Sequence, residues 1–178
     1  GELIPGIRHL VAAGDWLAVA KVVGKSALPL ILTIHAGELA AALAPALDVV
    51  ERDPRPEVLL AASVVAHHSR DFVTMRQNAL DAETALLASG VEPPRWAQVI
   101  VALARMVAAR VFTPVELYES ANEVLTVATG ASRNELPAVG AYAVIGRTNV
   151  AISLVLRSEF GRARVHLEDV RVEADRAG

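Results

Sequence analysis

A short turn recurs along this 178-residue chain, each time between two runs whose apolar residues have helical spacing. Each copy follows an apolar helical run, places an aromatic residue just past the break and opens a second helical run. The four copies are Ala13–Trp16, Ser69–Phe72, Arg110–Thr113 and Ser158–Gly161. A helical hairpin cannot bury its own apolar face and stacks on its neighbours, so the recurrence predicts a row of helical hairpins.

Composition agrees with helical packing. Hydrophobic residues make up 53% of the chain and aromatic residues only 4%, so the apolar mass is Ala, Val and Leu. No strand-like alternation persists. We predict an all-α fold: a right-handed array of antiparallel helical hairpins, a tetratricopeptide-like (TPR-like) α-solenoid of about 8–10 helices, forming a single domain over residues 1–178.

The intervals between the aromatic residues of the turn are unequal, and a strict repeat of about 34 residues does not fit. A chance recurrence of aromatic residues at helix starts is the alternative interpretation. The array is therefore expected to be degenerate.

Helix-start signals support this reading. Asp15 and Asp71 are expected to cap the helices that follow them, since a side-chain carboxylate can accept a hydrogen bond from the first turn. Thr113 and Glu116 form a capping-box pattern around Pro114, which suits the first helical position. Pro45 predicts a kink or break.

Gly24-Lys25-Ser26 resembles the end of a phosphate-binding loop, but Val19 stands where such a loop needs glycine. We interpret these residues as a helix C-terminus, with glycine as the stop and lysine near the negative end of the helix dipole. A short helix is then expected to begin at Pro29 and end near Gly37.

The residue types exclude several kinds of chemistry. The net charge of −3 argues against nucleic-acid binding by this segment, because phosphate binding needs a basic face. Cysteine is absent, which fits a cytoplasmic location. No apolar run was expected to reach the ~18–20 residues of a membrane span, so no membrane association is predicted.

Catalytic and metal-binding motifs are also missing. None of the five histidines forms a His-x-x-His pair, and no serine lies in a Gly-x-Ser-x-Gly turn. We therefore predict a non-catalytic chain without a cofactor or a metal. Self-association into a homo-oligomer is left open.

Polar residues recur on one side of the expected first helices of the hairpins, which often line the concave face of repeat arrays. They predict a groove for a small-molecule effector or a protein partner, against the alternative of an ordinary solvent face. The residues are His68, Arg95, Gln98, Arg105, Tyr142 and Asn149.

Two segments resemble known families. The last hairpin, from Val150 to Val170, resembles a tetratricopeptide repeat in the placing of its small residues. Gly6–Trp16 resembles the entry to the helical-repeat region in large ATP-binding transcriptional regulators of the LuxR type, the MalT-like family. That resemblance implies a nucleotide-binding domain upstream, a DNA-binding helix-turn-helix downstream, and an array that senses an inducer or partner. It carries over no inducer-binding residue.

Three functions follow from these observations. The first is a sensor or interaction domain of such a regulator, in a chain that is a fragment of a larger protein, since it begins at Gly1 rather than Met. The second is a stand-alone peptide-binding scaffold. The third is an all-helical enzyme, which would need a polar pocket holding several carboxylates or histidines.

Overall fold

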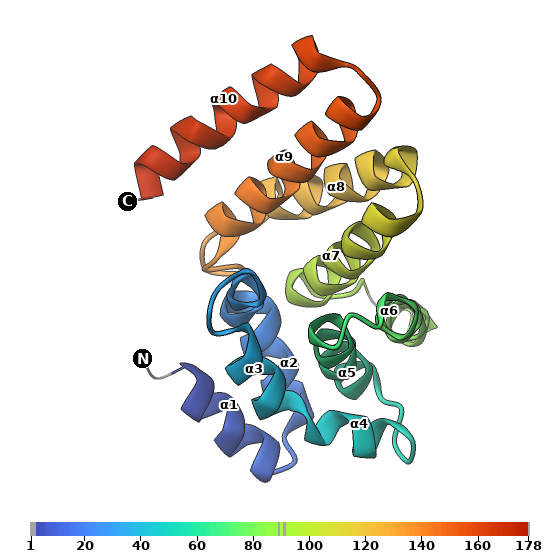
Figure 1. Ribbon diagram of the computed structural model, residues 1–178. Helices are drawn as coiled ribbons and strands as arrows, with labels where there is room; N and C mark the ends of the chain where they lie inside the picture. The colour runs from blue at the N-terminus through green and yellow to red at the C-terminus, as the bar shows by residue number, and fades with distance from the viewer. Residues whose placement is uncertain (1–2, 89, 91, 178) are drawn as a thin grey trace.

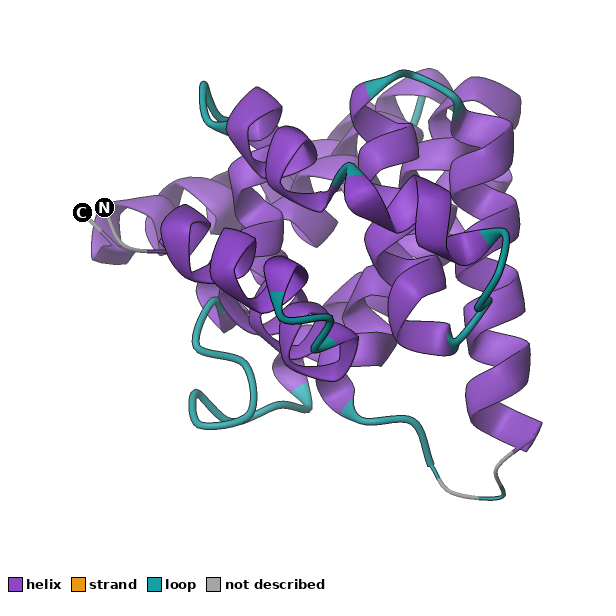
Figure 2. Cartoon of the chain, turned by 90° about the horizontal axis from the view of Figure 1, so that it is seen from below, coloured by secondary structure: helices purple, strands orange, loops and turns teal. Residues whose placement is uncertain are grey.

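The computed structural model describes residues 3–88, 90 and 92–177, and every regular element in these ranges is helical. Figure 2 shows helices and loops without a strand in this part of the chain. The all-α prediction is therefore confirmed for the described residues. The α-helices are α1 (Leu3–Ala12), α2 (Trp16–Val22), α3 (Ala36–Leu43), α4 (Pro45–Val50), α5 (Pro56–His68), α6 (Phe72–Ala88), α7 (Arg95–Phe112), α8 (Pro114–Thr129), α9 (Val139–Leu156) and α10 (Phe160–Ala177).

Long neighbouring helices pack as pairs: α5 with α6, α7 with α8, and α9 with α10 (Figure 1). Each pair also contacts the next, through α6 on α7 and α8 on α9. Gly146 lets α9 approach α8 closely, because an added Cβ would lie 2.9 Å from Leu125 Cγ and 3.2 Å from the Ala121 carbonyl oxygen. The absence of a side chain at Gly146 therefore sets the close spacing of α8 and α9 at this point.

The recurring turn has the same geometry in three of its four copies. In these copies the first helix ends in a Schellman motif. The residue that follows a left-handed residue donates its backbone N–H to the carbonyl oxygen five residues earlier. The left-handed residues are Gly14, Arg70 and Ser158, with φ of 71°, 59° and 63°. The long-range bonds are Asp15 to Leu10 at 3.1 Å, Asp71 to Ala66 at 2.9 Å and Glu159 to Leu154 at 2.8 Å.

The acidic residue of this turn then begins the next helix. Asp15 Oδ1 accepts from the Ala18 N–H at 3.0 Å, and Asp71 Oδ1 accepts from the Thr74 N–H at 3.0 Å. Both predicted caps are confirmed. Because Asp71 is stabilised as a carboxylate by the Thr74 hydrogen bond, its pKa is lowered.

The copy at Arg110–Thr113 differs. Here α7 continues through Phe112, so the aromatic residue ends the first helix rather than opening the second, and the expected placing is wrong. The Phe112 side chain lies outside the described residues. Thr113 begins α8 as predicted, with Oγ1 accepting from the Glu116 N–H at 3.1 Å.

The N-terminal part is built from shorter elements. After α2 the chain continues without a stop as a π-helix, η1 (Val23–Ala27), and a 3₁₀-helix, η2 (Leu28–Leu32). The interpretation of Gly24 as a helix stop is therefore wrong. The short helix expected at Pro29 is present as η2, but it ends at Leu32 rather than near Gly37. The break at Pro45 is confirmed, since α3 ends at Leu43 and α4 begins at Pro45.

One apolar core joins both parts. α2, α3 and α4 pack against α5, and η1 and α2 reach α7. Buried residues of this core run from Ile4 in α1 to Ala163 in α10. At the meeting point an added Cβ on Gly24 would lie 2.3 Å from the Trp96 carbonyl oxygen, so only glycine permits this approach.

Candidate ligand cavity at the start of α7

Two of the six predicted groove residues lie together at the start of α7. Arg95 Nη1 donates to Gln98 Oε1 at 2.9 Å, and Gln98 Nε2 donates to the Pro93 carbonyl at 2.6 Å. Both side chains line a cavity of about 550 Å³. This volume is in the range of small-molecule sites.

The cavity wall comes from three segments that are far apart in the sequence. Lys21 and Lys25 come from α2 and η1, residues 92–98 from the approach to α7 and its first turn, and Glu135 from the loop between α8 and α9. In Figure 1 these segments meet at the middle of the molecule, where the blue η1 region, the lime start of α7 and the loop before orange α9 come together.

Positive charge exceeds negative charge in this cavity. Lys21, Lys25 and Arg95 face the carboxylates of Glu92 and Glu135. Glu135 is already engaged, since it accepts from the Ser132 N–H at 2.9 Å and from Ser132 Oγ at 2.8 Å. These hydrogen bonds, and then the nearby Arg95 and Lys25 charges, lower the pKa of Glu135.

Hydrogen bonds join η1, which carries Lys25, to α9 and the residue before it. The Tyr142 hydroxyl donates to the Gly24 carbonyl at 2.7 Å, and the Ala138 N–H donates to the Lys25 carbonyl at 3.3 Å. Tyr142 is fully buried, and burial raises the pKa of its phenol. The structure therefore places Tyr142 in the core as a tie between η1 and α9, away from any open groove.

Asn149 is also a buried contact rather than a groove residue. Its side chain is 1% exposed; Nδ2 donates to the Ile145 carbonyl at 2.8 Å and Oδ1 accepts from Arg110 Nε at 2.6 Å. Burial lowers the pKa of Arg110. The pair joins α7 to α9 directly.

Arg105 bridges three helices. Its guanidinium donates to Glu123 Oε1 of α8 at 2.9 Å and contacts Glu83 of α6 through a second ion pair. The carboxylates of Glu83 and Glu123 accept from the guanidinium N–H groups of Arg105 that a ligand would otherwise use. Arg105 is therefore a link between α6, α7 and α8.

His68 lies apart from the other five predicted residues, exposed at the end of α5 near Gly37 of α3. Its neighbour His67 is half-buried, with its ring 6.4 Å from that of Phe72 in an edge-to-face arrangement. Burial, and then the charges of His68 and Arg110, lower the pKa of His67. The structure thus unites Arg95 and Gln98 and separates His68, Arg105, Tyr142 and Asn149 from them.

Sequence reasoning missed Lys21, Lys25 and Glu135 as cavity residues, because they come from other segments than α7. The sequence carries a signal for this site in Gly24-Lys25-Ser26, because its lysine lines the cavity. Within the ranges that the structure describes, no three His, Cys, Asp or Glu side chains cluster as metal ligands.

By length and composition α9 could cross a membrane, so the expectation that no apolar run is long enough does not hold for this helix. In the structure α9 packs against α8 and α10, as a core helix does. The cytoplasmic location and the absence of membrane association stay predictions.

Comparison of the chain with protein-family models, with curated proteins and with solved structures found no match.

Proposed function

We propose that this chain is the non-catalytic sensor and interaction domain of a LuxR-type transcriptional regulator similar to the MalT-like family. In this proposal α5 to α10 form a right-handed TPR-like array, and α1 to α4 form its entry. Support comes from the resemblance of Gly6–Trp16 and from the turn that Gly14, Arg70 and Ser158 repeat with one geometry.

The cavity at the start of α7 carries the proposal. Its wall joins α2 and η1 to α7 and to the loop before α9, and the Tyr142 hydroxyl ties η1 to α9. A ligand that contacts all three segments favours the arrangement in which they are together. Binding energy at this junction is thereby coupled to the relative positions of the entry helices and the helix pairs, which is what a relay requires.

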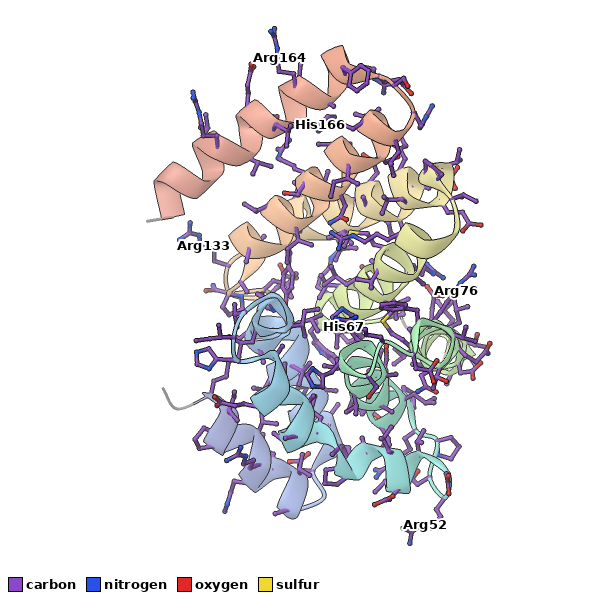
Figure 3. The ribbon with its side chains drawn as sticks, viewed as in Figure 1. Arg52, His67, Arg76, Arg133, Arg164 and His166 are labelled. Carbon is purple, nitrogen blue, oxygen red and sulfur yellow. The ribbon has the colours of Figure 1, made fainter. Side chains whose placement is uncertain are left out.

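A catalytic role has less support. A general acid–base pair needs two titratable groups in one enclosed site. Across the described residues, His166 Nδ1 is the buried side-chain nitrogen or oxygen without a hydrogen-bond partner, and its pKa is lowered mainly by burial. In Figure 3 His166 lies on α10 facing α9, and it is not among the residues that line the cavity at the start of α7.

The gene that encodes the chain tests the proposal. We expect a phosphate-binding loop domain upstream of residue 1 and a helix-turn-helix downstream of residue 178. A thermal-shift screen of small molecules with the isolated chain complements this, because a ligand of the native state raises its stability by mass action. A gene that encodes neither domain contradicts the proposal.

Exposed apolar side chains favour a second candidate, the stand-alone peptide-binding scaffold. They gather on α9 and α10 and include Val155, Leu156, Phe160 and Leu167. Selection from a displayed peptide library separates the candidates. A peptide consensus whose binding is lost in Leu156→Ser and Phe160→Ser supports the scaffold, whereas the sensor predicts small-molecule binding at the start of α7.

A further inference from the structure

The lysines of this chain are not distributed over its surface. Of the 17 lysine and arginine residues, only Lys21 and Lys25 are lysines, and both line the cavity at the start of α7. They stand four residues apart on consecutive helical turns, which places them on one side. A lysine ammonium is a compact charge with three donors on a flexible stem, whereas arginine suits planar ion pairs.

The cations of the cavity differ from the ion-paired arginines of this chain in how their charge is compensated. Arg105 and Arg157, for example, form ion pairs with glutamates at 2.9 Å. Within the described residues, Lys21, Lys25 and Arg95 form no ion pair with a carboxylate. Gln98 orients the Arg95 guanidinium and does so without neutralising it.

The protein itself therefore leaves positive charge at this cavity unpaired, in a chain whose net charge is −3. Glu135 offsets part of that charge, but its carboxylate is already held by Ser132. Glu92 is exposed, and its Oε1 lies 3.4 Å from Gln98 Nε2. Three cations from two distant segments converge here on a volume of metabolite size.

We propose that the cavity binds the anionic group of a small molecule, a phosphate or a carboxylate, through Lys21, Lys25 and Arg95. Oxygen anions form short, charge-assisted hydrogen bonds with ammonium and guanidinium donors. Pro93 and Pro94 supply an apolar wall for the uncharged part of the ligand. This inference rests on the proposed sensor function and names its ligand class.

The acetylation rates of Lys21 and Lys25 can show whether an anion occupies the cavity. The folded chain is acetylated with a water-soluble amine reagent, and the rates at Lys21 and Lys25 are measured by peptide mass spectrometry. The probes are pyrophosphate and citrate, each compared with sodium chloride at equal ionic strength. We expect both rates to fall roughly tenfold when a probe is present at ten times its Kd.

Arg95→Gln separates a site from a salt effect, because both lysine reporters stay in place. We expect this variant to lose the protection. The control is Arg52→Gln, since Figure 3 places Arg52 at the end of α4, away from the start of α7. Circular dichroism and thermal unfolding of both variants establish that each is folded.

Protection that Arg95→Gln abolishes and Arg52→Gln retains supports the proposal. Protection by pyrophosphate alone assigns a phosphate, and protection by citrate alone assigns a carboxylate. The proposal is overturned if neither anion protects the lysines, or if protection persists undiminished in folded Arg95→Gln.

Failure here is distinguishable from failure of the sensor function. If neither anion protects but an uncharged compound raises the melting temperature, or the flanking domains are found, the sensor proposal stands without an anionic ligand. If the anions bind and the gene encodes no flanking domain, the regulator proposal falls and the anion site stands.

Discussion

The two parts of this molecule follow different rules. From α5 to α10 the helices are long, and among the residues that the structure describes there the turns at Arg70 and Ser158 are Schellman turns. From α1 to α4 the helices are short, and η1 and η2 replace regular α-helix between Val23 and Leu32. The comparison shows that local signals shape the helix pairs and the turn between α1 and α2, whereas packing against α5 and α7 shapes the chain from η1 to α4.

The largest expected effect comes from Gly24, where the two parts meet. Gly24→Ala places a Cβ 2.3 Å from the Trp96 carbonyl oxygen, a backbone atom that moves only with α7. We expect the free energy of unfolding to fall by about 3 kcal/mol, as for overpacked cores. Urea unfolding measures it.

The matched control is Gly140→Ala in α9, where nothing lies within 4 Å of the added Cβ. This variant should raise the free energy of unfolding by up to about 1 kcal/mol, because alanine has a higher helix propensity than glycine. If both variants changed stability alike, the close approach of η1 to α7 would be refuted.

Tyr142→Phe tests the tie between η1 and α9. The variant leaves the buried Gly24 carbonyl without its 2.7 Å hydroxyl donor, so we expect a loss of about 1.5 kcal/mol. Tyr118→Phe is the control, because the Tyr118 hydroxyl accepts from Arg162 at an exposed site and should contribute less. Equal effects in urea unfolding would argue against a buried tie.

Removing glycine from one turn should lower the stability of the protein, and adding glycine to another should raise it. Gly14→Ala puts a Cβ on a residue with φ of 71° and should cost about 1 kcal/mol, the cost of the left-handed conformation. Ser158→Gly, at φ of 63°, should gain a similar amount. Thermal unfolding of both variants checks this, and a destabilised Ser158→Gly would mean that the two turns are not equivalent.

The smallest effect is a dependence on pH at His67, which lies between the two parts beside Leu28 and Ile31 of η2. Burial lowers the His67 pKa, so the folded state binds fewer protons than the unfolded state. Its contribution to stability is present above the unfolded pKa of about 6.5 and is lost as the pH falls through the lower folded value.

An NMR titration of the His67 ring measures its pKa directly, and the stability of His67→Gln between pH 7.5 and pH 5 provides the comparison. We expect stability to fall less steeply with acid in the variant. A His67 pKa at or above the ordinary value would contradict the prediction.

Much of the fold could be predicted because its signals are local. Asp15, Asp71 and Thr113 cap helices through side-chain bonds to residues three positions away, and such spacings are visible in the sequence. The position of Phe112 relative to the end of α7 was predicted wrongly. The sequence alone does not distinguish an aromatic residue in the last turn of one helix from an aromatic residue in the first turn of the next.

The candidate site was harder to predict. Arg95 and Gln98 share a helical face, so their spacing in the sequence predicted that they lie together, and the structure shows them hydrogen-bonded. Tyr142 and Asn149 share a face of α9 by the same reasoning, yet α7, α8 and η1 cover that face. Periodicity shows which residues lie on one side of a helix and says nothing of which helix packs there.

The sequence by itself determined that this chain is helical, where α2, α6 and α8 begin, and that the copies at Gly14, Arg70 and Ser158 are turns. Those features depend on hydrogen bonds and backbone angles within a few residues. Only the tertiary structure decided that η1 reaches the start of α7, because that contact joins Gly24 to Trp96 across a long stretch of chain. The same contact brings the chain's two lysines beside Arg95, since the position of a charge in space depends on packing and not on its neighbours in sequence.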